Sequence, residues 1–331
     1  MSVPFAQIEP TTVCNLRCAM CDRDRLDAVG HMRLDQFERI IDKLDGLQAV
    51  KLQGLGEPML NPDFVPMIQV LRARGIRAYS VLNVTKIDAN NAEALASVAD
   101  RLELSLDSAD PEQFAAIRKG ARLDDVLERV RVLVEARNRR GQFLELSANA
   151  VVHTADRAEL KALFELISRL GLDRLNLNVV QFWDIGEGDE PAPKARHVLT
   201  AEDLDTIKAA VETLSWDWSL PARMMTPMAG YENCPWHRGG IYVSWQGRVT
   251  PCCQRPDPRT ISFGNLLEQS LDEIWESDAY RAFRAELAAG RPPETCRTCT
   301  MFYPHGQKQW TSYTSRATTS AALSASARST S

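Results

Sequence analysis

The segment Cys14-Asn-Leu-Arg-Cys18-Ala-Met-Cys21 is the most informative stretch of this chain, because it gathers three thiols in one short loop. It follows an apolar run that is expected to form the first strand. Three thiolates in such a loop can each ligate one iron of a four-iron cluster, which leaves the fourth iron open for chemistry. A zinc site is the alternative interpretation, and its fourth ligand would then be Asp22, Asp24 or His31.

The eight cysteines of the chain form two groups, and none lies between Cys21 and Cys234. The chain has no stretch of about 20 apolar residues that could span a membrane, and Met1–Asn15 lacks the apolar core of a signal peptide. We therefore expect a cytoplasmic protein without a membrane partner. In that reducing compartment, clustered cysteines more often bind metal or take part in chemistry than form disulfides.

Length and composition indicate an ordinary globular protein. The chain has 331 residues, of which 44% are hydrophobic and 25% charged, which excludes a disordered chain, a collagen-like fibre and a small disulfide scaffold. The length is enough for about two domains. The 39 basic and 44 acidic residues are well mixed and leave a net charge of −5, so no basic surface predicts a nucleic-acid partner.

Six apolar runs alternate with amphipathic segments over the first two thirds of the chain. Parallel strands need such crossover segments, so the pattern predicts a parallel sheet covered by helices. Six units are too few to close an eight-stranded barrel. We therefore predict an α/β fold over residues 1–225, a partial (β/α)6 TIM-like barrel whose working face lies at the carboxyl ends of its strands. The expected strands are Phe5–Glu9, Ala49–Leu52, Ala78–Leu82, Arg101–Leu106, Leu144–Val152 and Arg174–Val180.

Local signals support the ends of several expected helices. Gly75 and Gly171 each follow a helical run and precede a strand, as residues after a helix C-terminus do. Thr200 with Asp203 three residues later indicates an N-cap. The polar stretch Asp184–Pro193 is either a plain linker or a lid over the site.

The pattern changes after Asn233 and predicts a small α+β domain over residues 226–305. Two short strands, Ile241–Ser244 and Arg248–Pro251, surround a turn at Gln246–Gly247, and a helix is expected at Leu271–Ala289. Residues 306–331 are rich in Ser, Thr and Ala without apolar periodicity, so we expect a disordered tail.

The cysteine loop resembles the signature of the radical S-adenosylmethionine (radical SAM) superfamily, C-x3-C-x2-C after the first strand of a partial barrel. The resemblance implies that Cys14, Cys18 and Cys21 hold a catalytic 4Fe–4S cluster whose open iron chelates S-adenosylmethionine. It extends along most of the chain, because further matches lie in order at the strand ends. Residues implied to contact the cofactor are Met20, Gly54, Gly56, Glu57, Asn83, Ser105, Arg118 and Asn149.

These implied contacts differ in chemistry. Gln53-Gly54-Leu55-Gly56-Glu57-Pro58 resembles the family's GGEP segment, which meets the amino group, although Leu55 replaces a family glycine. Asn83 stands where the family often has T-N-G. Ser105 and Asn149 match ribose contacts, Arg118 matches the basic residue near the methionine carboxylate, and Met20 matches the apolar contact to adenine.

The C-terminal cysteines resemble the SPASM/twitch extension of the same superfamily. Cys234, Gly247 and Cys252 give C-x12-G-x4-C, and Cys296 and Cys299 give C-x2-C. No cysteine follows Cys299, so the shorter twitch form fits, with these four cysteines on one auxiliary 4Fe–4S cluster. A zinc ribbon is the alternative, but its signature needs two C-x2-C knuckles and only one is present.

Cys253 is the cysteine that this ligand count leaves over. It is either a small buried neighbour of Cys252 or a thiol that returns a hydrogen atom to a substrate radical. The resemblance implies cleavage of S-adenosylmethionine to a 5′-deoxyadenosyl radical, with an electron from a flavodoxin- or ferredoxin-type donor. Hydrogen abstraction and oxidation of the substrate would follow, or epimerisation if Cys253 donates.

Only 13 residues precede Cys14, which leaves no room for a leader-peptide-binding domain. We therefore expect a small polar substrate, a sugar or aminocyclitol of natural-product biosynthesis, that the enzyme dehydrogenates. Radical modification of a ribosomal peptide is the alternative, since a separate protein can recognise the leader. A non-catalytic iron–sulfur electron carrier is the alternative outside enzymes, and it would need no cofactor contacts at the strand ends.

Overall fold

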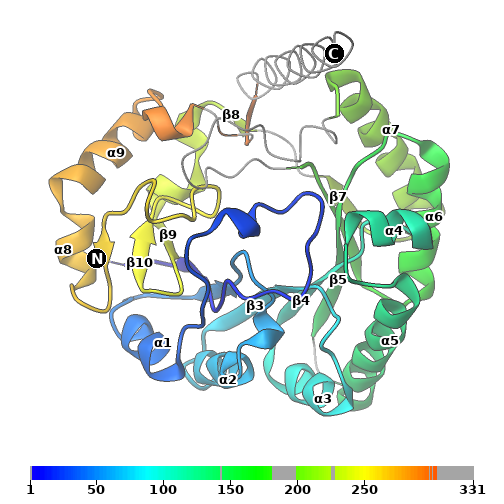
Figure 1. The fold of residues 1–331 in the computed structure, drawn as a ribbon. Helices are drawn as coiled ribbons and strands as arrows, with labels where there is room; N and C mark the ends of the chain where they lie inside the picture. The colour runs from blue at the N-terminus through cyan, green and yellow to red at the C-terminus, as the bar shows by residue number, and fades with distance from the viewer. Residues whose placement is uncertain are drawn as a thin grey trace, which may run out of the picture.

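A curved sheet of ten strands organises the protein, with helices packed on its outer side (Figure 1). The structure is a computed structural model and describes residues 2–141, 144–180, 199–224, 228–297, 299 and 301–303. The strand order is β11-β10-β9-β1-β2-β3-β4-β5-β6-β7. The first seven strands are β1 (Phe5–Ile8), β2 (Ala49–Leu52), β3 (Arg77–Leu82), β4 (Arg101–Ser105), β5 (Glu145–Val151), β6 (Arg174–Asn178) and β7 (Ala222–Met224).

These seven strands pair in parallel and alternate with helices, which confirms the predicted partial barrel. Two features differ from the prediction. Two helices instead of one follow β4, and β7 adds a seventh parallel strand after the last helix. The helices are α1 (Leu34–Ile41), α2 (Phe64–Ala73), α3 (Ala89–Val98), α4 (Pro111–Ile117), α5 (Leu123–Arg140), α6 (Arg157–Arg169) and α7 (Ala201–Asp217).

The predicted helix ends are confirmed by their backbone geometry. Gly75 and Gly171 both have φ of +70°, the left-handed conformation that glycine adopts without strain. The Thr200 side chain accepts a hydrogen bond from the Asp203 amide, and the Asp203 carboxylate bonds back to the Thr200 amide. This reciprocal pair caps α7.

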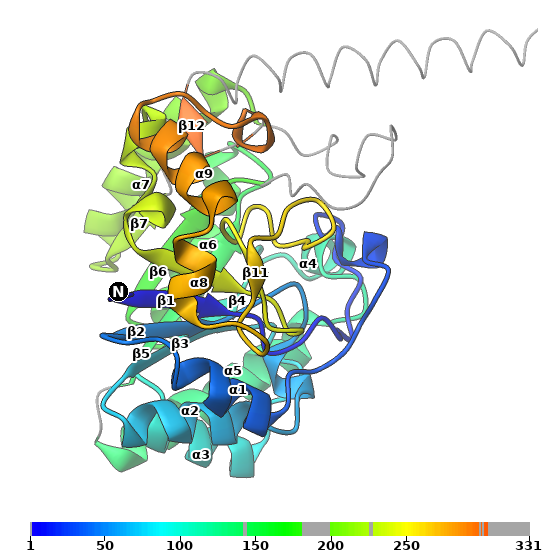
Figure 2. The same ribbon diagram turned by 90° about the vertical axis from the view of Figure 1, so that its left-hand side faces the viewer.

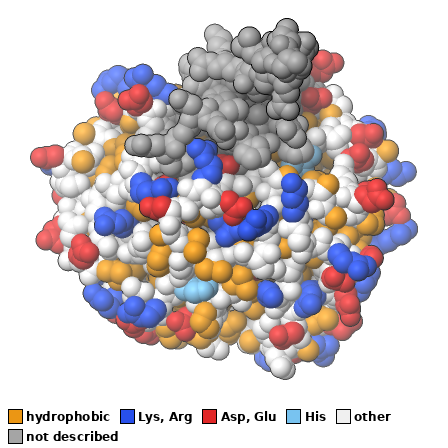
Figure 3. All heavy atoms as spheres, in the orientation of Figure 1, with side chains coloured by type: hydrophobic (Ala, Val, Ile, Leu, Met, Phe, Trp, Pro, Cys, Tyr) orange, Lys and Arg blue, Asp and Glu red, His pale blue; other side chains and the backbone are white. Residues whose placement is uncertain are grey.

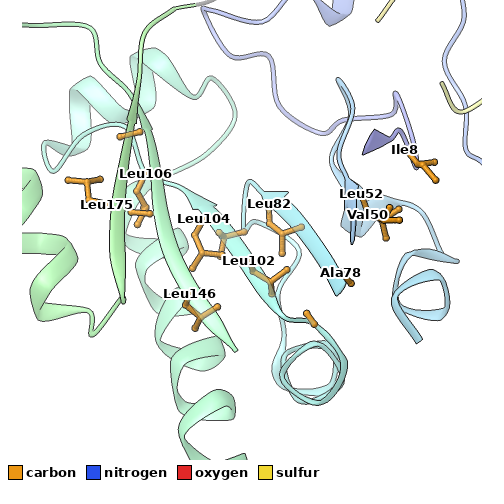
Figure 4. Close-up of a cluster of buried hydrophobic side chains, with 14 of the residues drawn as sticks. Ile8, Val50, Leu52, Ala78, Leu82, Leu102, Leu104, Leu106, Leu146 and Leu175 are labelled. Carbon is orange, nitrogen blue, oxygen red and sulfur yellow. The ribbon is translucent and has the colours of Figure 1, made fainter. Parts of the chain in front are cut away.

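Apolar side chains on the outer side of the sheet form the core (Figure 4). Successive residues of a strand point to opposite faces, so one alternate set of positions meets the helices. Val50, Leu52, Leu82, Leu102 and Leu104 belong to this set, and all are fully buried. Burial of each such leucine contributes about 1.5–3 kcal/mol. The other set points into the barrel, where the site lies.

The C-terminal region continues the same sheet. Strand β9 (Gly240–Val243) pairs in parallel with β1, in the register Phe5↔Gly240 to Ile8↔Val243. Strand β10 (Arg248–Thr250) is antiparallel to β9 and to β11 (Gly264–Asn265). The sheet therefore continues across the domain boundary that the sequence predicts between residues 225 and 226. A separate parallel pair joins β8 (Met228–Ala229) to β12 (Phe302–Tyr303).

The prediction of a single helix at Leu271–Ala289 is wrong, because the structure has two helices there. They are α8 (Leu271–Trp275) and α9 (Asp278–Ala288). The Ser277 side chain accepts a hydrogen bond from the Tyr280 amide and starts the second helix. The predicted segments Asp184–Pro193 and 306–331 lie outside the described residues.

The loop with the first three cysteines lies beyond the carboxyl ends of the strands, in dark blue in Figure 2. Figure 3 shows this face of the molecule, where acidic and basic side chains are interspersed and apolar side chains are exposed between them. No helix within the described ranges combines the length and apolar character needed to cross a bilayer.

Candidate active site

A cavity of about 380 Å³ opens inside the barrel at the carboxyl ends of the strands. This volume lies in the range of small-molecule sites. The structure brings twelve of the predicted site residues to its wall. They are Cys14, Cys18, Met20, Cys21, Gly54, Gly56, Glu57, Asn83, Ser105, Arg118, Asn149 and Cys253.

The loop that carries the first three cysteines is held at both ends. At its base, the Thr11 hydroxyl donates to the Gly30 carbonyl at 2.9 Å, and the Gly30 amide donates to the Thr12 hydroxyl at 3.0 Å. At its far side, the Ala19 amide donates to the Ile117 carbonyl at 2.8 Å, at the end of α4. A folded loop of this kind fixes where the thiols point.

The surroundings of these thiols fit ligands of a metal cluster. Burial raises the pKa values of Cys14 and Cys18, so both thiols keep their protons in the absence of a metal. N–H groups nevertheless face the sulfurs. The side-chain Nδ2 of Asn83 lies 3.9 Å from Sγ of Cys14, and Nη1 of Arg118 lies 3.8 Å from Sγ of Cys18. These donors favour the thiolate that metal binding requires.

Arg118 is held in place by a carboxylate that the sequence analysis did not assign. Its guanidinium bonds to both oxygens of Asp107, at 3.2 Å for Nη2 and Oδ1 and more closely for Nε and Oδ2. Oδ1 of Asp107 also accepts from the Val151 amide at 2.8 Å. The pair fixes a cation beside Cys18.

The glycine-rich segment lies directly against the cysteine loop. The Gly56 amide donates to the Thr11 carbonyl at 3.1 Å. A Cβ atom at Gly56 would overlap that carbonyl and would lie 2.6 Å from the Val13 carbonyl, so only glycine fits. The Glu57 carboxylate accepts from the amides of Asn83 at 2.7 Å and Met59 at 3.3 Å, and burial raises its pKa to about 7.

The opposite wall carries the predicted ribose and adenine contacts. The register of β4 and β5 places Ser105 opposite Asn149, and Asn149 accepts a hydrogen bond from Asn178. Met20 packs with Ile117 and Val180 in a small buried apolar cluster. This wall offers hydroxyl and amide groups beside an apolar patch, the chemistry that a nucleoside needs.

Sequence reasoning missed the polar floor of the cavity. Nζ of Lys51 on β2 lies 3.2 Å from Oε2 of Glu103 on β4, and Gln7 on β1 lies beside them in the cavity wall. The signal was present, since the alternation within each strand places these residues on the side opposite the buried leucines.

The four predicted auxiliary ligands gather outside this cavity. Burial raises the pKa values of Cys234, Cys252 and Cys296, the last to about 12. The nearby Cys299 thiol raises all three further, which indicates that the four thiols lie close together. No three metal-binding side chains among the described residues converge on one point suitable for a single ion. A four-iron cluster takes its cysteines on separate irons, so its ligands need not meet at one point.

Cys253 faces the barrel cavity, whereas Cys252 does not line it. Burial raises the pKa of Cys253 to about 11, and the Lys51 ammonium opposes that effect. The turn that joins Cys252 to Arg255 presents the two consecutive thiols to different surroundings. The leftover cysteine of the ligand count is therefore the one that reaches the candidate substrate space.

Two family models match this chain. One, described as the radical SAM superfamily, matches residues 8–167. The other, SPASM, described as an iron–sulfur cluster-binding domain, matches residues 234–300. Together they imply S-adenosylmethionine and two iron–sulfur clusters as cofactors.

The chain is similar to characterised proteins over most of its length. The PqqA peptide cyclase of Streptomyces rochei is 28% identical over 304 residues, which cover 88% of this chain and 80% of the relative. SuiB of Streptococcus suis, bound to S-adenosylmethionine, has a TM-score of 0.72 at 18% identity over 91% of this chain and 71% of its own. SuiB has also been solved with its precursor peptide SuiA.

A further structure shares the fold more distantly. BtrN in complex with AdoMet and 2-DOIA has a TM-score of 0.51 at 14% identity, over 88% of this chain and 89% of its own. At such identities the likeness to solved structures extends to the fold alone.

Proposed function

Since the chain belongs to the radical SAM superfamily and carries a C-terminal SPASM domain, we propose that it modifies a peptide by activating one of its C–H bonds. The observation that carries this proposal is the similarity to PqqA peptide cyclase over 88% of the chain. A radical SAM enzyme, in place of a non-catalytic electron carrier, is the class of protein that the family matches support.

A peptide substrate takes the place of the small sugar or aminocyclitol expected from the sequence. That expectation rested on the short segment before Cys14. A separate protein can supply leader recognition, so the short segment does not exclude a peptide. The structure of SuiB bound to the precursor peptide SuiA supports the same choice, because SuiB shares the fold of this chain.

The residues around the cavity divide the work of the reaction. When bound, S-adenosylmethionine and the reduced cluster supply abstraction of a hydrogen atom from an unactivated C–H bond, with the electron from a flavodoxin- or ferredoxin-type donor. Cys14, Cys18 and Cys21 would hold that cluster. Asp107 holds the Arg118 guanidinium beside Cys18, where this cation would bind the carboxylate of S-adenosylmethionine.

The Lys51–Glu103 pair would bind a polar group of the peptide residue that reacts. An ion pair partly removed from water is costly unless further polar groups bind it, and both Lys51 and Glu103 line the cavity, where a substrate group can do so. Dehydrogenation or epimerisation of a small polar molecule is the second candidate function, since the same polar floor would suit a hydroxyl-rich substrate.

The test compares two kinds of substrate on anaerobically reconstituted, reduced enzyme. Peptides selected by binding from a randomised displayed library form one panel, and amino sugars and aminocyclitols form the other. We expect a selected peptide to raise 5′-deoxyadenosine formation above the substrate-free rate and to change in mass. Stimulation by the sugar panel, with every selected peptide inert, would show that the substrate is a small molecule.

A further inference from the structure

Glu9 is a buried carboxylate that the roles proposed above leave unused. It directly follows β1, and only 3% of its surface is exposed. Burial raises its pKa to about 7, and the other main influences on that pKa are the Leu55 and Trp245 amides, the Tyr242 hydroxyl and the Asp257 carboxylate, none of which is a cation. A buried acid without a cation must be compensated by other groups.

Two backbone amides from distant parts of the chain compensate it. Oε1 of Glu9 accepts from the Leu55 amide at 3.0 Å, and Oε2 accepts from the Trp245 amide at 3.3 Å. Leu55 lies in the middle of the glycine-rich segment that lines the cavity. Trp245 lies in the turn between β9 and β10, within the SPASM domain. One carboxylate thus connects the cofactor segment to the C-terminal domain.

Two glycines make room for this connection. A Cβ atom at Gly54 would overlap Cγ and Oε1 of Glu9, so residue 54 must lack a side chain for Glu9 to fit. A Cβ atom at Gly30 would lie 2.5 Å from the ring of Trp245. Gly30 is also the residue to which the base of the cysteine loop is bonded. The turn at Trp245 therefore contacts both Glu9 and Gly30, the residue that holds the base of the cysteine loop.

The backbone around Glu9 ties three strands together. The Glu9 amide donates to the Val243 carbonyl of β9 at 2.8 Å, and the Gln53 amide donates to the Ile8 carbonyl of β1 at 3.1 Å. The Glu9 side chain extends this junction beyond the ends of β1, β2 and β9, to the segment that the strands themselves no longer hold.

We propose that Glu9 is a positioning residue through which the C-terminal domain holds the Gly54–Pro58 segment in the conformation that receives S-adenosylmethionine. Without the carboxylate, the buried Leu55 amide and the partly buried Trp245 amide lose their partner, and the segment loses its connection to the β9–β10 turn. The role is independent of whether the substrate is a peptide or a small molecule.

The test uses Glu9→Ala, Glu9→Gln and a matched control, Asp100→Asn, in the reconstituted enzyme. Asp100 is a suitable control because its carboxylate also accepts from a backbone amide, that of Ala78 at 2.8 Å, but at the opposite end of the strands. Two quantities are measured, the Kd of S-adenosylmethionine by calorimetry and amide hydrogen exchange by mass spectrometry.

We expect Glu9→Ala to raise the Kd roughly tenfold and to speed exchange in both 53–57 and 244–247. Glu9→Gln should have a smaller effect of the same kind, because its amide oxygen still accepts one of the two N–H groups. Asp100→Asn should speed exchange near residue 78 and leave the Kd unchanged.

A wild-type Kd in Glu9→Ala with both clusters present would overturn the proposal. So would faster exchange confined to 244–247, since Glu9 would then serve the C-terminal domain alone. If Glu9→Ala does not retain its clusters, Glu9→Gln decides, and an unchanged Kd and exchange pattern in that variant refute the role.

Discussion

At the scale of single residues, the role of Cys253 decides which product the enzyme forms. Its thiol lines the barrel cavity, and burial raises its pKa to about 11, so it carries its hydrogen at neutral pH. An S–H bond is weaker than a typical C–H bond, which makes hydrogen transfer to a carbon radical favourable once contact is made. We propose that Cys253 is not a cluster ligand, and iron content tests this directly.

The variant Cys253→Ala should keep about eight irons, as two four-iron clusters require, and should still form 5′-deoxyadenosine. Loss of about four irons would identify Cys253 as a ligand instead. In an oxidative reaction the variant retains most product formation. Deuterium from solvent at an inverted carbon of the wild-type product, absent in the variant, would assign the thiol as hydrogen donor.

Glu9 and Glu57 make stability depend on pH. Burial raises both pKa values from 4.5 to about 7, so between these pH values the folded chain binds more protons than the unfolded chain. Stability should therefore fall as pH rises from about 4.5 to about 7 and then level off. Within that window each of the two groups lowers the free energy of unfolding by about 1.4 kcal/mol for every pH unit. Urea unfolding of Glu9→Gln across this range should show a shallower fall, and an unchanged slope would contradict the prediction.

At the scale of elements, the glycine-rich segment and the cysteine loop act as one unit. Gly56→Ala would press a methyl group into the Thr11 and Val13 carbonyls, which forces the segment away from the loop. Overpacking of this kind costs about 1–3 kcal/mol. We expect weaker binding of S-adenosylmethionine by calorimetry and slower formation of 5′-deoxyadenosine.

A control for this substitution lies at the end of α2. Gly75→Ala also strains the backbone, because φ is +70°, but no atom lies within 4 Å of its would-be Cβ. It should lower the melting temperature and leave cofactor binding intact. Equal loss of binding in both variants would mean that general destabilisation explains the effect of Gly56→Ala.

The elements that the sequence predicted well are those with a long regular signal. The expected strand Leu144–Val152 and the observed Glu145–Val151 differ only at the ends, because apolar alternation marks a strand clearly. Strand β7 was missed because three residues carry no alternation. The break between α8 and α9 was missed because the apolar spacing continues through it, and only the Ser277 cap marks it.

The site residues that could be predicted are likewise those with a local signal in the sequence. The cysteines and glycines were found because their spacing in the chain is itself the signal. Glu9 was missed as a functional residue because its partners are amides 46 and 236 positions away. Asp107 was missed because it pairs with Arg118, 11 positions away across a helix end, and with an amide 44 positions away. No local pattern reveals that kind of partner.

At the scale of the whole molecule, the pairing of β9 with β1 makes one sheet of the two domains. Metal binding at the auxiliary cysteines should thus stabilise the barrel as well, because cluster binding there contributes folding free energy. Cys296→Ala combined with Cys299→Ala should lose about four irons. Calorimetry should show one unfolding transition at a lower temperature. Two separate transitions, with the barrel transition unmoved, would contradict this coupling.

The strands of the barrel carry two alternating sets of residues. One set packs against the helices and stabilises the fold, and the other lines the cavity. Leu52, Leu102 and Leu104 face the helices, while their neighbours Lys51 and Glu103 face the cavity. Exchange of a cavity residue leaves the helix-facing layer untouched, so a mutation that alters substrate choice need not threaten folding. Such a scaffold can diverge toward new substrates by single steps, each of which is viable on its own.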